Sequence, residues 1–262
     1  MYDISSIVIS AILFVSMLAA IEIGYRFGLQ NQSGISESSK THINAIQASL
    51  LGVLALLIGF TFSLSLQRYD SRTAAVVDEA NAIGTTYLRA QLLVSDFDQR
   101  AQQLLRDYLE KRIAAGATTL VDQAVRQTLL DEAKHIQSEL WTLATELVSA
   151  DDRPTTSGLF IQSLNELIDN LESRDAALNR HVPEVVLLLL YGTFLMTGSI
   201  VGYAAGVAGH RTSYITYIMS GLIVLLVFVI VDLDRPRRGL IEVSQKSLTD
   251  LQSTMAAPQQ NQ

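Results

Sequence analysis

The stretch AIQASLLGVLALLIGFTFSLSL, residues 45–66, decides the fold class of this protein. It contains no charged residue, and a helix needs about 20 mostly apolar residues to cross a hydrocarbon layer about 30 Å thick. Three more runs of similar length and character occupy residues 4–24, 185–207 and 213–233. The sequence therefore predicts four membrane-spanning helices, called spans 1 to 4 in chain order.

The composition agrees with a membrane protein. Of the 262 residues, 49% are hydrophobic and only 17% are charged, and the mean hydropathy is +0.28. The absence of cysteine excludes disulfides, thiolate metal sites and cysteine nucleophiles. The four histidines are scattered singly, and no glycine-rich phosphate loop, nucleophile elbow or dinucleotide fingerprint occurs. We therefore expect no metal, no cofactor and no enzyme activity, and the net charge of −7 argues against a nucleic acid partner.

Basic residues near the span ends predict the orientation, because loops rich in lysine and arginine stay in the cytoplasm. Arg68 and Arg72 follow span 2, and Arg235 follows span 4, whereas the loop between spans 3 and 4 offers only His210 and Arg211. We therefore expect a multi-pass protein with both termini in the cytoplasm. The first run lacks a basic segment before it, so we interpret it as a retained anchor and not as a cleaved signal peptide.

Between spans 2 and 3, residues 67–182 interleave charged and apolar side chains at helical spacing. The pattern from Val76 indicates that span 2 continues as a helix into the cytoplasm, and it extends to Gly116, a typical helix stop. Two more amphipathic helices follow, one from Leu120 and one after residues 151–154, where acidic caps precede a helix-starting proline. The predicted fold is all-α, with a cytoplasmic antiparallel helical domain, residues 67–182, between spans 2 and 3 and a cytoplasmic tail, residues 234–262.

The pattern also predicts where individual side chains of this domain lie. Val76, Ile83 and their neighbours at spacings of three and four form the apolar side of the first helix. Arg72 and Glu79 fall largely elsewhere, so we expect them on its polar side. The single tryptophan, Trp141, is interpreted as a core residue.

Small and polar side chains form a stripe along span 2 at spacings of three and four residues. The stripe consists of Ser49, Gly52, Leu56, Gly59, Ser63 and Gln67. One interpretation is helix packing, because small residues let transmembrane backbones approach closely. The other is the wall of an ion pathway, in which these positions leave room for hydrated ions and Phe60 or Phe62 forms a constriction. Spacing alone leaves both open.

Charged residues gather at the expected inner ends of spans 2 and 4. They are Arg68, Asp70, Arg72, Asp232, Asp234 and Arg235. Ionisable groups are costly in lipid unless they find a partner or water, so these residues are candidates for a charged cytoplasmic mouth or for interfacial ion pairs that join spans 2 and 4. In span 3, Gly198, Gly202 and Gly206 repeat every four residues, which predicts a tightly packed helix pair.

Three blocks, SLSLQRYDSR at 63–72, VDEANAIGT at 77–85 and DLDRPRRG at 232–239, resemble the bestrophin-like family of bacterial membrane proteins. The likeness in layout covers nearly the whole chain. It implies a four-span subunit of the bacterial inner (plasma) membrane that assembles into a ring, a pentamer, with span 2 lining an ion pathway as in bestrophin anion channels. Animal bestrophins follow their last span with an acidic cluster that helps to bind calcium, whereas Arg235, Pro236, Arg237 and Arg238 stand here. Calcium gating is therefore not carried over.

The leading hypothesis is an oligomeric ion channel or channel-like protein whose partners are membrane lipid, inorganic ions and further copies of itself. The alternative is a non-conducting membrane scaffold or sensor that binds a protein partner through its cytoplasmic helices. The size of the domain at residues 67–182 motivates this second hypothesis.

Overall fold

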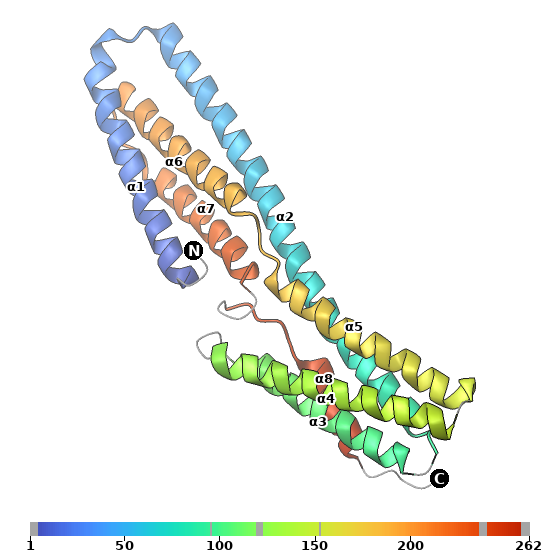
Figure 1. Cartoon of the computed structure of the whole chain (residues 1–262). Helices are drawn as coiled ribbons and strands as arrows, with labels where there is room; N and C mark the ends of the chain where they lie inside the picture. Colours follow the sequence, from blue (N-terminus) through green and yellow to red (C-terminus); the bar gives the residue numbers. More distant parts are fainter. Residues whose placement is uncertain (1–4, 95, 119–122, 152, 236–239, 258–262) are drawn as a thin grey trace. The chain divides into compact units, whose positions relative to one another are not determined.

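The computed structural model describes residues 5–94, 96–118, 123–151, 153–235 and 240–257 (Figure 1). Within these ranges the chain folds into helices and contains no β-strand, so the all-α prediction is confirmed. The helices are α1 (Ser6–Asn31), α2 (Glu37–Ala90), α3 (Phe97–Ala117), α4 (Gln123–Ala150), α5 (Leu159–Asn179), α6 (Glu184–Val207), α7 (Tyr214–Leu233) and α8 (Lys246–Ala256), with short turns η1 (Gln32–Gly34) and η3 (Pro154–Gly158).

Within the described ranges, four helical stretches are long and apolar enough to cross a membrane, and they contain α1, α2, α6 and α7. Each contains the core of one predicted span. Helix α1 continues to Asn31, beyond the predicted end at residue 24, while α6 and α7 begin within one residue of the predicted starts. Helix α2 is one continuous element of 54 residues, so the prediction that span 2 extends as a helix is confirmed.

The chain divides into two compact units. The first, called the spanning unit, comprises Met1–Tyr69 and His181–Ile241. The second, called the helical unit, comprises Asp70–Arg180 and Glu242–Gln262. The residues around α8 thus belong to the same unit as α3, α4 and α5.

Glycines bring α1 and α6 of the spanning unit into close contact. A Cβ atom at Gly202 would overlap the carbonyl oxygen of Ile21, and one at Gly206 would overlap the carbonyl oxygen of Tyr25. In return, a Cβ at Gly24 would overlap the carbonyl oxygen of Ser199. The small residues therefore let the two backbones touch, and the packing predicted for span 3 is confirmed.

An apolar cluster joins all four helices of the spanning unit. Met17 of α1, Leu54 of α2, Phe194 of α6 and Val227 of α7 are each at most 5% exposed and belong to it. Helix α2 therefore presents one apolar side to the rest of its own unit.

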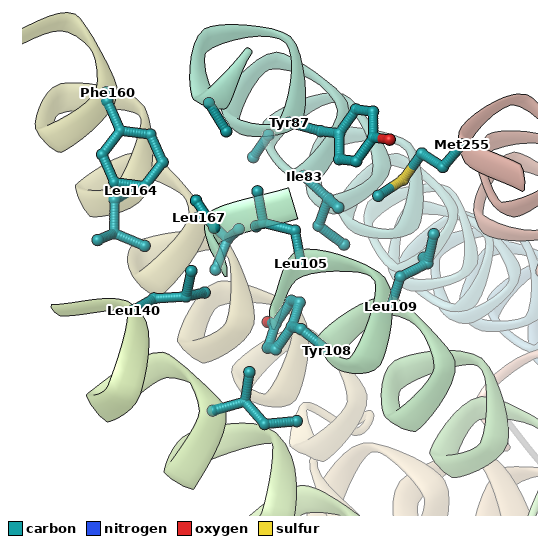
Figure 2. Packing of buried hydrophobic residues seen from close by; sticks show 14 of the residues in the cluster. Ile83, Tyr87, Leu105, Tyr108, Leu109, Leu140, Phe160, Leu164, Leu167 and Met255 are labelled. Carbon is teal, nitrogen blue, oxygen red and sulfur yellow. The ribbon is translucent and has the colours of Figure 1, made fainter. Parts of the chain in front are cut away.

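The core of the helical unit is built from α2, α3, α4, α5 and α8 (Figure 2). Its largest members include Ile83, Tyr87, Leu105, Tyr108, Leu109, Leu140, Phe160, Leu164, Leu167 and Met255. The apolar pattern from Val76 to Gly116 does not belong to one helix, because α2 ends at Ala90 and the chain turns before α3. Because the chain turns between α2 and α3, Leu105 and Leu109 pack in the same core as Ile83. In one straight helix these residues would lie too far apart to share a core.

Several local predictions about this unit can be compared with the structure. The predicted acidic cap is not seen among the described residues, because η3 has no side-chain cap hydrogen bond and Asp151 Oδ1 accepts from the backbone N–H of Arg153, the residue before η3, at 3.2 Å. The predicted start at a proline is confirmed, since Pro154 opens η3. Leu120 and Asp152 lie outside the described residues. Trp141 is 42% exposed, so its assignment to the core was wrong: its neighbour Leu140 fills the core position instead.

Candidate functional site

One face of α2 is packed against the rest of the spanning unit. Leu54, Thr61 and Ser65 are each at most 1% exposed, and their spacings of seven and four residues place them on one side of the helix. The hydroxyl of Thr61 donates to the carbonyl oxygen of Leu57 at 2.6 Å, so it is satisfied within α2 itself. This face is called the packed face of α2.

The predicted stripe lies on the opposite face. Ser63 is nine residues from Leu54, which corresponds to a rotation of about 180° at 3.6 residues per turn. All six stripe residues are exposed in the single chain: Ser49, Gly52, Leu56, Gly59, Ser63 and Gln67. This face is called the polar face of α2.

The glycines of the polar face do not serve close packing inside the chain. Apart from the neighbouring backbone of α2 itself, no atom of the described structure lies within 4 Å of a Cβ built at Gly52 or at Gly59. At Gly202, in contrast, an added Cβ would overlap the backbone of another helix. Small residues therefore allow close helix packing at Gly202, but not at Gly52 or Gly59 within the described chain. Within one chain, the described residues therefore do not pack closely on Gly52 or Gly59. Packing between copies remains the alternative to an ion pathway.

The two phenylalanines flank the polar face on different sides, because two residues correspond to a rotation of about 200°. Phe60 is 61% exposed and Phe62 is 37% exposed. Phe60 lies about 60° from Ser63 around the helix, and Phe62 about 100°. Phe60 therefore lies closer to the polar face than Phe62 does. Of the two side chains, Phe60 is the better candidate for the constriction of an ion pathway along that face.

The charged residues that follow along α2 differ in exposure. Arg68 is partly buried, Asp70 is exposed, and Arg72 is only 1% exposed. In the helical unit the Arg72 guanidinium donates to the carbonyl oxygens of Ala177 at 3.2 Å and Arg180 at 2.6 Å. It thereby caps the last turn of α5, where a cation also interacts favourably with the helix dipole. The expectation that Arg72 stands on the polar side of its helix was wrong.

The charged residues at the end of span 4 are also buried. Asp232, Asp234 and Arg235 are 1%, 2% and 4% exposed. The carboxylate of Asp234 accepts from the backbone N–H of Val182 at 3.0 and 3.1 Å, which ties the end of α7 to the start of α6. Asp232 Oδ2 accepts from the N–H of Ile241 at 2.9 Å. The basic residues 237 and 238 lie outside the described part of the chain.

A buried polar network in the helical unit escaped the sequence analysis. Glu79 of α2 is fully buried and pairs with Arg112 of α3, whose Nε lies 2.5 Å from Glu79 Oε1, and with Arg174 of α5. Gln137 of α4 donates to the Tyr108 hydroxyl at 3.3 Å, and that hydroxyl lies 3.5 Å from Glu79 Oε1. Three helices, α2, α3 and α5, thus meet at one carboxylate, and α4 is linked to it through the Tyr108 hydroxyl.

The expectation that Glu79 lies off the apolar stripe was wrong for a simple reason. Glu79 stands four residues before Ile83 and three after Val76, so it shares their side of α2. A hydropathy pattern counts a carboxylate as polar and assigns it to solvent, although partners on other helices can keep it inside. The spacing of Glu79 from Val76 and Ile83 was the one feature of the sequence that could have indicated its burial.

The network shifts the ionisation of its members. Burial, followed by the charge of Glu79, raises the pKa of Tyr108 far above its ordinary value, so the phenol stays neutral. Burial by itself lowers the pKa of Arg112, but the charge of Glu79 and the hydrogen bond to Glu79 outweigh it and raise the pKa. Arg112 therefore stays charged inside the core.

No three His, Asp or Glu side chains in the described ranges gather closely enough to hold a metal ion. The arrangement offers two other features: an unoccupied polar face along an apolar spanning helix, and a charged core in the helical unit. Neither feature contains a nucleophile paired with a base.

Comparisons with known proteins show which proteins this chain is similar to. A comparison with curated proteins found no match. One variant of a bacterial bestrophin homologue from Klebsiella pneumoniae superposes with a TM-score of 0.65 at 18% identity, covering 91% of this chain and 98% of its own. A second variant of it gives 0.69 at 17% identity, with 96% and 98% covered.

A third solved structure, described as a membrane protein variant, gives a TM-score of 0.69 at 19% identity and covers 96% of this chain and 98% of its own. At these identities the likeness shows the fold, which is that of the bacterial bestrophin homologue. The Bestrophin-like domain matches residues 14–248, nearly the whole chain. This helical membrane protein therefore belongs to the bestrophin-like family.

Proposed function

We propose that this protein is an oligomeric ion channel in which α2 of every copy lines a central pathway. The observation that carries the proposal is the position of the polar face of α2, opposite the packed face and unoccupied within the chain. The resemblance to bestrophin anion channels supports the same function. By that resemblance the assembly is a pentamer of the bacterial inner membrane. The basic residues that follow spans 2 and 4 predict that both termini and the helical unit lie in the cytoplasm.

The physical argument starts from what the spanning helices leave exposed. On α1, α6 and α7 the exposed side chains are mainly large and apolar, such as Val15, Leu188 and Leu225, which suits contact with lipid. Ser63 and Gln67 on α2 are polar, and lipid offers no partner for a hydroxyl or an amide. Water, or a neighbouring copy beside water, satisfies such groups.

Individual residues take different parts in this proposal. The six stripe residues, Ser49, Gly52, Leu56, Gly59, Ser63 and Gln67, line the pathway, and Phe60 narrows it, with Phe62 nearer the flank. Arg68 and Asp70 belong to its cytoplasmic mouth. Arg72, Asp232, Asp234 and Arg235 are buried, and Arg72 and Asp234 bind backbone groups at helix ends, so we assign these four residues to structure and not to ion contact.

A matched pair of glycine variants tests the proposal in planar bilayers with purified protein. Gly59 of α2 and Gly221 of α7 both have open space around a built Cβ, so a side chain can be added at either position without a clash at its Cβ. Gly59→Leu should lower the single-channel conductance at least several-fold, because it adds a bulky side chain to the polar face. Gly221→Leu should conduct like the unmodified protein.

Two results would overturn this function. One is the absence of conductance from intact oligomers of the unmodified protein across several salts and voltages. The other is equal conductance in both glycine variants, which would place the ion pathway away from the polar face.

A further inference from the structure

Three arginines of the helical unit share only two carboxylates. Arg112 of α3 and Arg174 of α5 both pair with Glu79. Arg126 of α4 lies 3.5 Å from Asp175, measured from Nη2 to Oδ1. Three positive charges against two negative charges leave one positive charge over, within the part of the unit that the structure describes.

Among the described residues, no further carboxylate pairs with the three arginines. Tyr108 stays neutral, because burial and the charge of Glu79 raise its pKa. Gln245, which precedes α8, accepts from Arg174 Nη2 at 2.6 Å but carries no charge. Burial lowers the pKa of Arg126, the charge of Asp175 opposes that effect, and repulsion by Arg112 and Arg174 adds to it. The cluster is thus electrostatically coupled and rich in positive charge.

Two N–H donors of the cluster are buried and unused. Arg126 Nε and Arg174 Nε have no hydrogen-bond partner among the described residues. Buried donors are normally satisfied, and an orphaned one calls for an explanation such as an ion. The side chain of Arg174 is only 3% exposed, whereas that of Arg126 is 20% exposed. A ligand would therefore reach the cluster from the side of Arg126.

We propose that the helical unit binds a small inorganic anion at Arg126, close to Arg174 and Arg112. An anion supplies the missing negative charge and accepts from the unused Arg126 Nε. Guanidinium N–H groups bind both halides and oxyanions, and they bind oxyanions through two parallel hydrogen bonds. Because Arg126 is mostly buried, the ligand must be small. This site is separate from the polar face of α2 and does not depend on ion conduction.

Thermal unfolding of the full-length protein in detergent tests the site. The midpoint of unfolding is measured in sodium chloride, sodium phosphate and sodium gluconate at equal ionic strength. A bound anion stabilises the folded state, so chloride or phosphate should raise the midpoint by about 3 °C or more over bulky gluconate. A larger rise with phosphate identifies an oxyanion site, and a larger rise with chloride a halide site.

Arg126→Lys is the informative variant, because lysine keeps the charge near Asp175 but has no Nε–H donor in that geometry. It should lose most of the anion-dependent rise. Arg100→Lys is the matched control, since Arg100 belongs to α3 of the same unit, is about half exposed and already pairs with Glu146. This variant should keep the full rise.

Crystals of the unmodified protein soaked in bromide test the site without any variant. We expect an anomalous peak beside Arg126 Nε.

The proposal is overturned if chloride and phosphate give no rise in the unfolding midpoint over gluconate. It is equally overturned if Arg126→Lys retains the rise of the unmodified protein. Bromide bound there without any anion-dependent rise would mean an adventitious ion only, which also counts against the site. Loss of conductance would not affect these readouts, so the two proposals fail separately.

Discussion

Arg112 Nε lies 2.5 Å from Glu79 Oε1, and the two side chains are 2% and 0% exposed. The pair joins α3 to the part of α2 that belongs to the helical unit, and Arg174 brings α5 to the same carboxylate. Buried ion pairs contribute little net stability, but removing one partner is costly because a charge is left inside without compensation. Removing the charge of Glu79 should therefore be costly for the packing of this unit.

Replacing Glu79 by glutamine should destabilise the helical unit by about 3–5 kcal/mol, because Arg112 and Arg174 both lose their counter-charge while the volume is unchanged. Thermal unfolding followed by circular dichroism measures the change. Glu146→Gln is the control: Glu146 pairs with Arg100 at 3.1 Å, and both side chains are about half exposed. Similar unfolding midpoints for the two variants would contradict the central role of Glu79.

Replacing Gly202 by alanine should force α1 and α6 apart, since the added Cβ overlaps the backbone of Ile21. Overpacking of this kind costs about 1–3 kcal/mol. The yield of monodisperse protein and its unfolding midpoint should both fall. Gly192→Ala on the same helix has open space around the Cβ and should leave both unchanged. A tolerated Gly202→Ala would mean that the two helices are not in backbone contact.

The absence of cysteine makes the polar face of α2 directly testable with thiol reagents. A cysteine in place of Ser63, which is exposed, should react rapidly with a membrane-impermeant thiosulfonate if the polar face borders water. Ser65→Cys is the control, because Ser65 is 0% exposed on the packed face two residues away. Equal, slow labelling of both in reconstituted protein would show that the polar face is sealed, and would favour a non-conducting scaffold.

Removing the Arg72 side chain should loosen the end of α5. The guanidinium donates to two carbonyl oxygens there, and hydrogen bonds from charged groups contribute about 1.5–3 kcal/mol each. Hydrogen exchange of the amides in residues 175–180 should become at least tenfold faster in Arg72→Ala. In Arg89→Ala, which removes an exposed donor to Leu159 O at the start of α5, the same amides should keep their rates.

Much of the architecture follows from local features of the sequence. Four apolar runs of about 20 residues predict four spans, because lipid leaves a helix as the only way for such a segment to satisfy its backbone. The glycine repeat of span 3 predicts close packing for the same local reason. The end of α2 at Ala90 could not be predicted, since no glycine or proline marks it and only the shared core with α3 makes the turn favourable.

By itself, the sequence determined the helical class, the four spans and the existence of a small, polar stripe on span 2, since each depends on neighbours a few positions apart. Only the tertiary structure decided that this stripe lies opposite the packed face. It alone decided that Arg72 and Glu79 are inside, because the partners that make this possible are far along the chain. For Glu79 they stand 33 and 95 residues away, and a charge can be buried only where folding brings such partners to it.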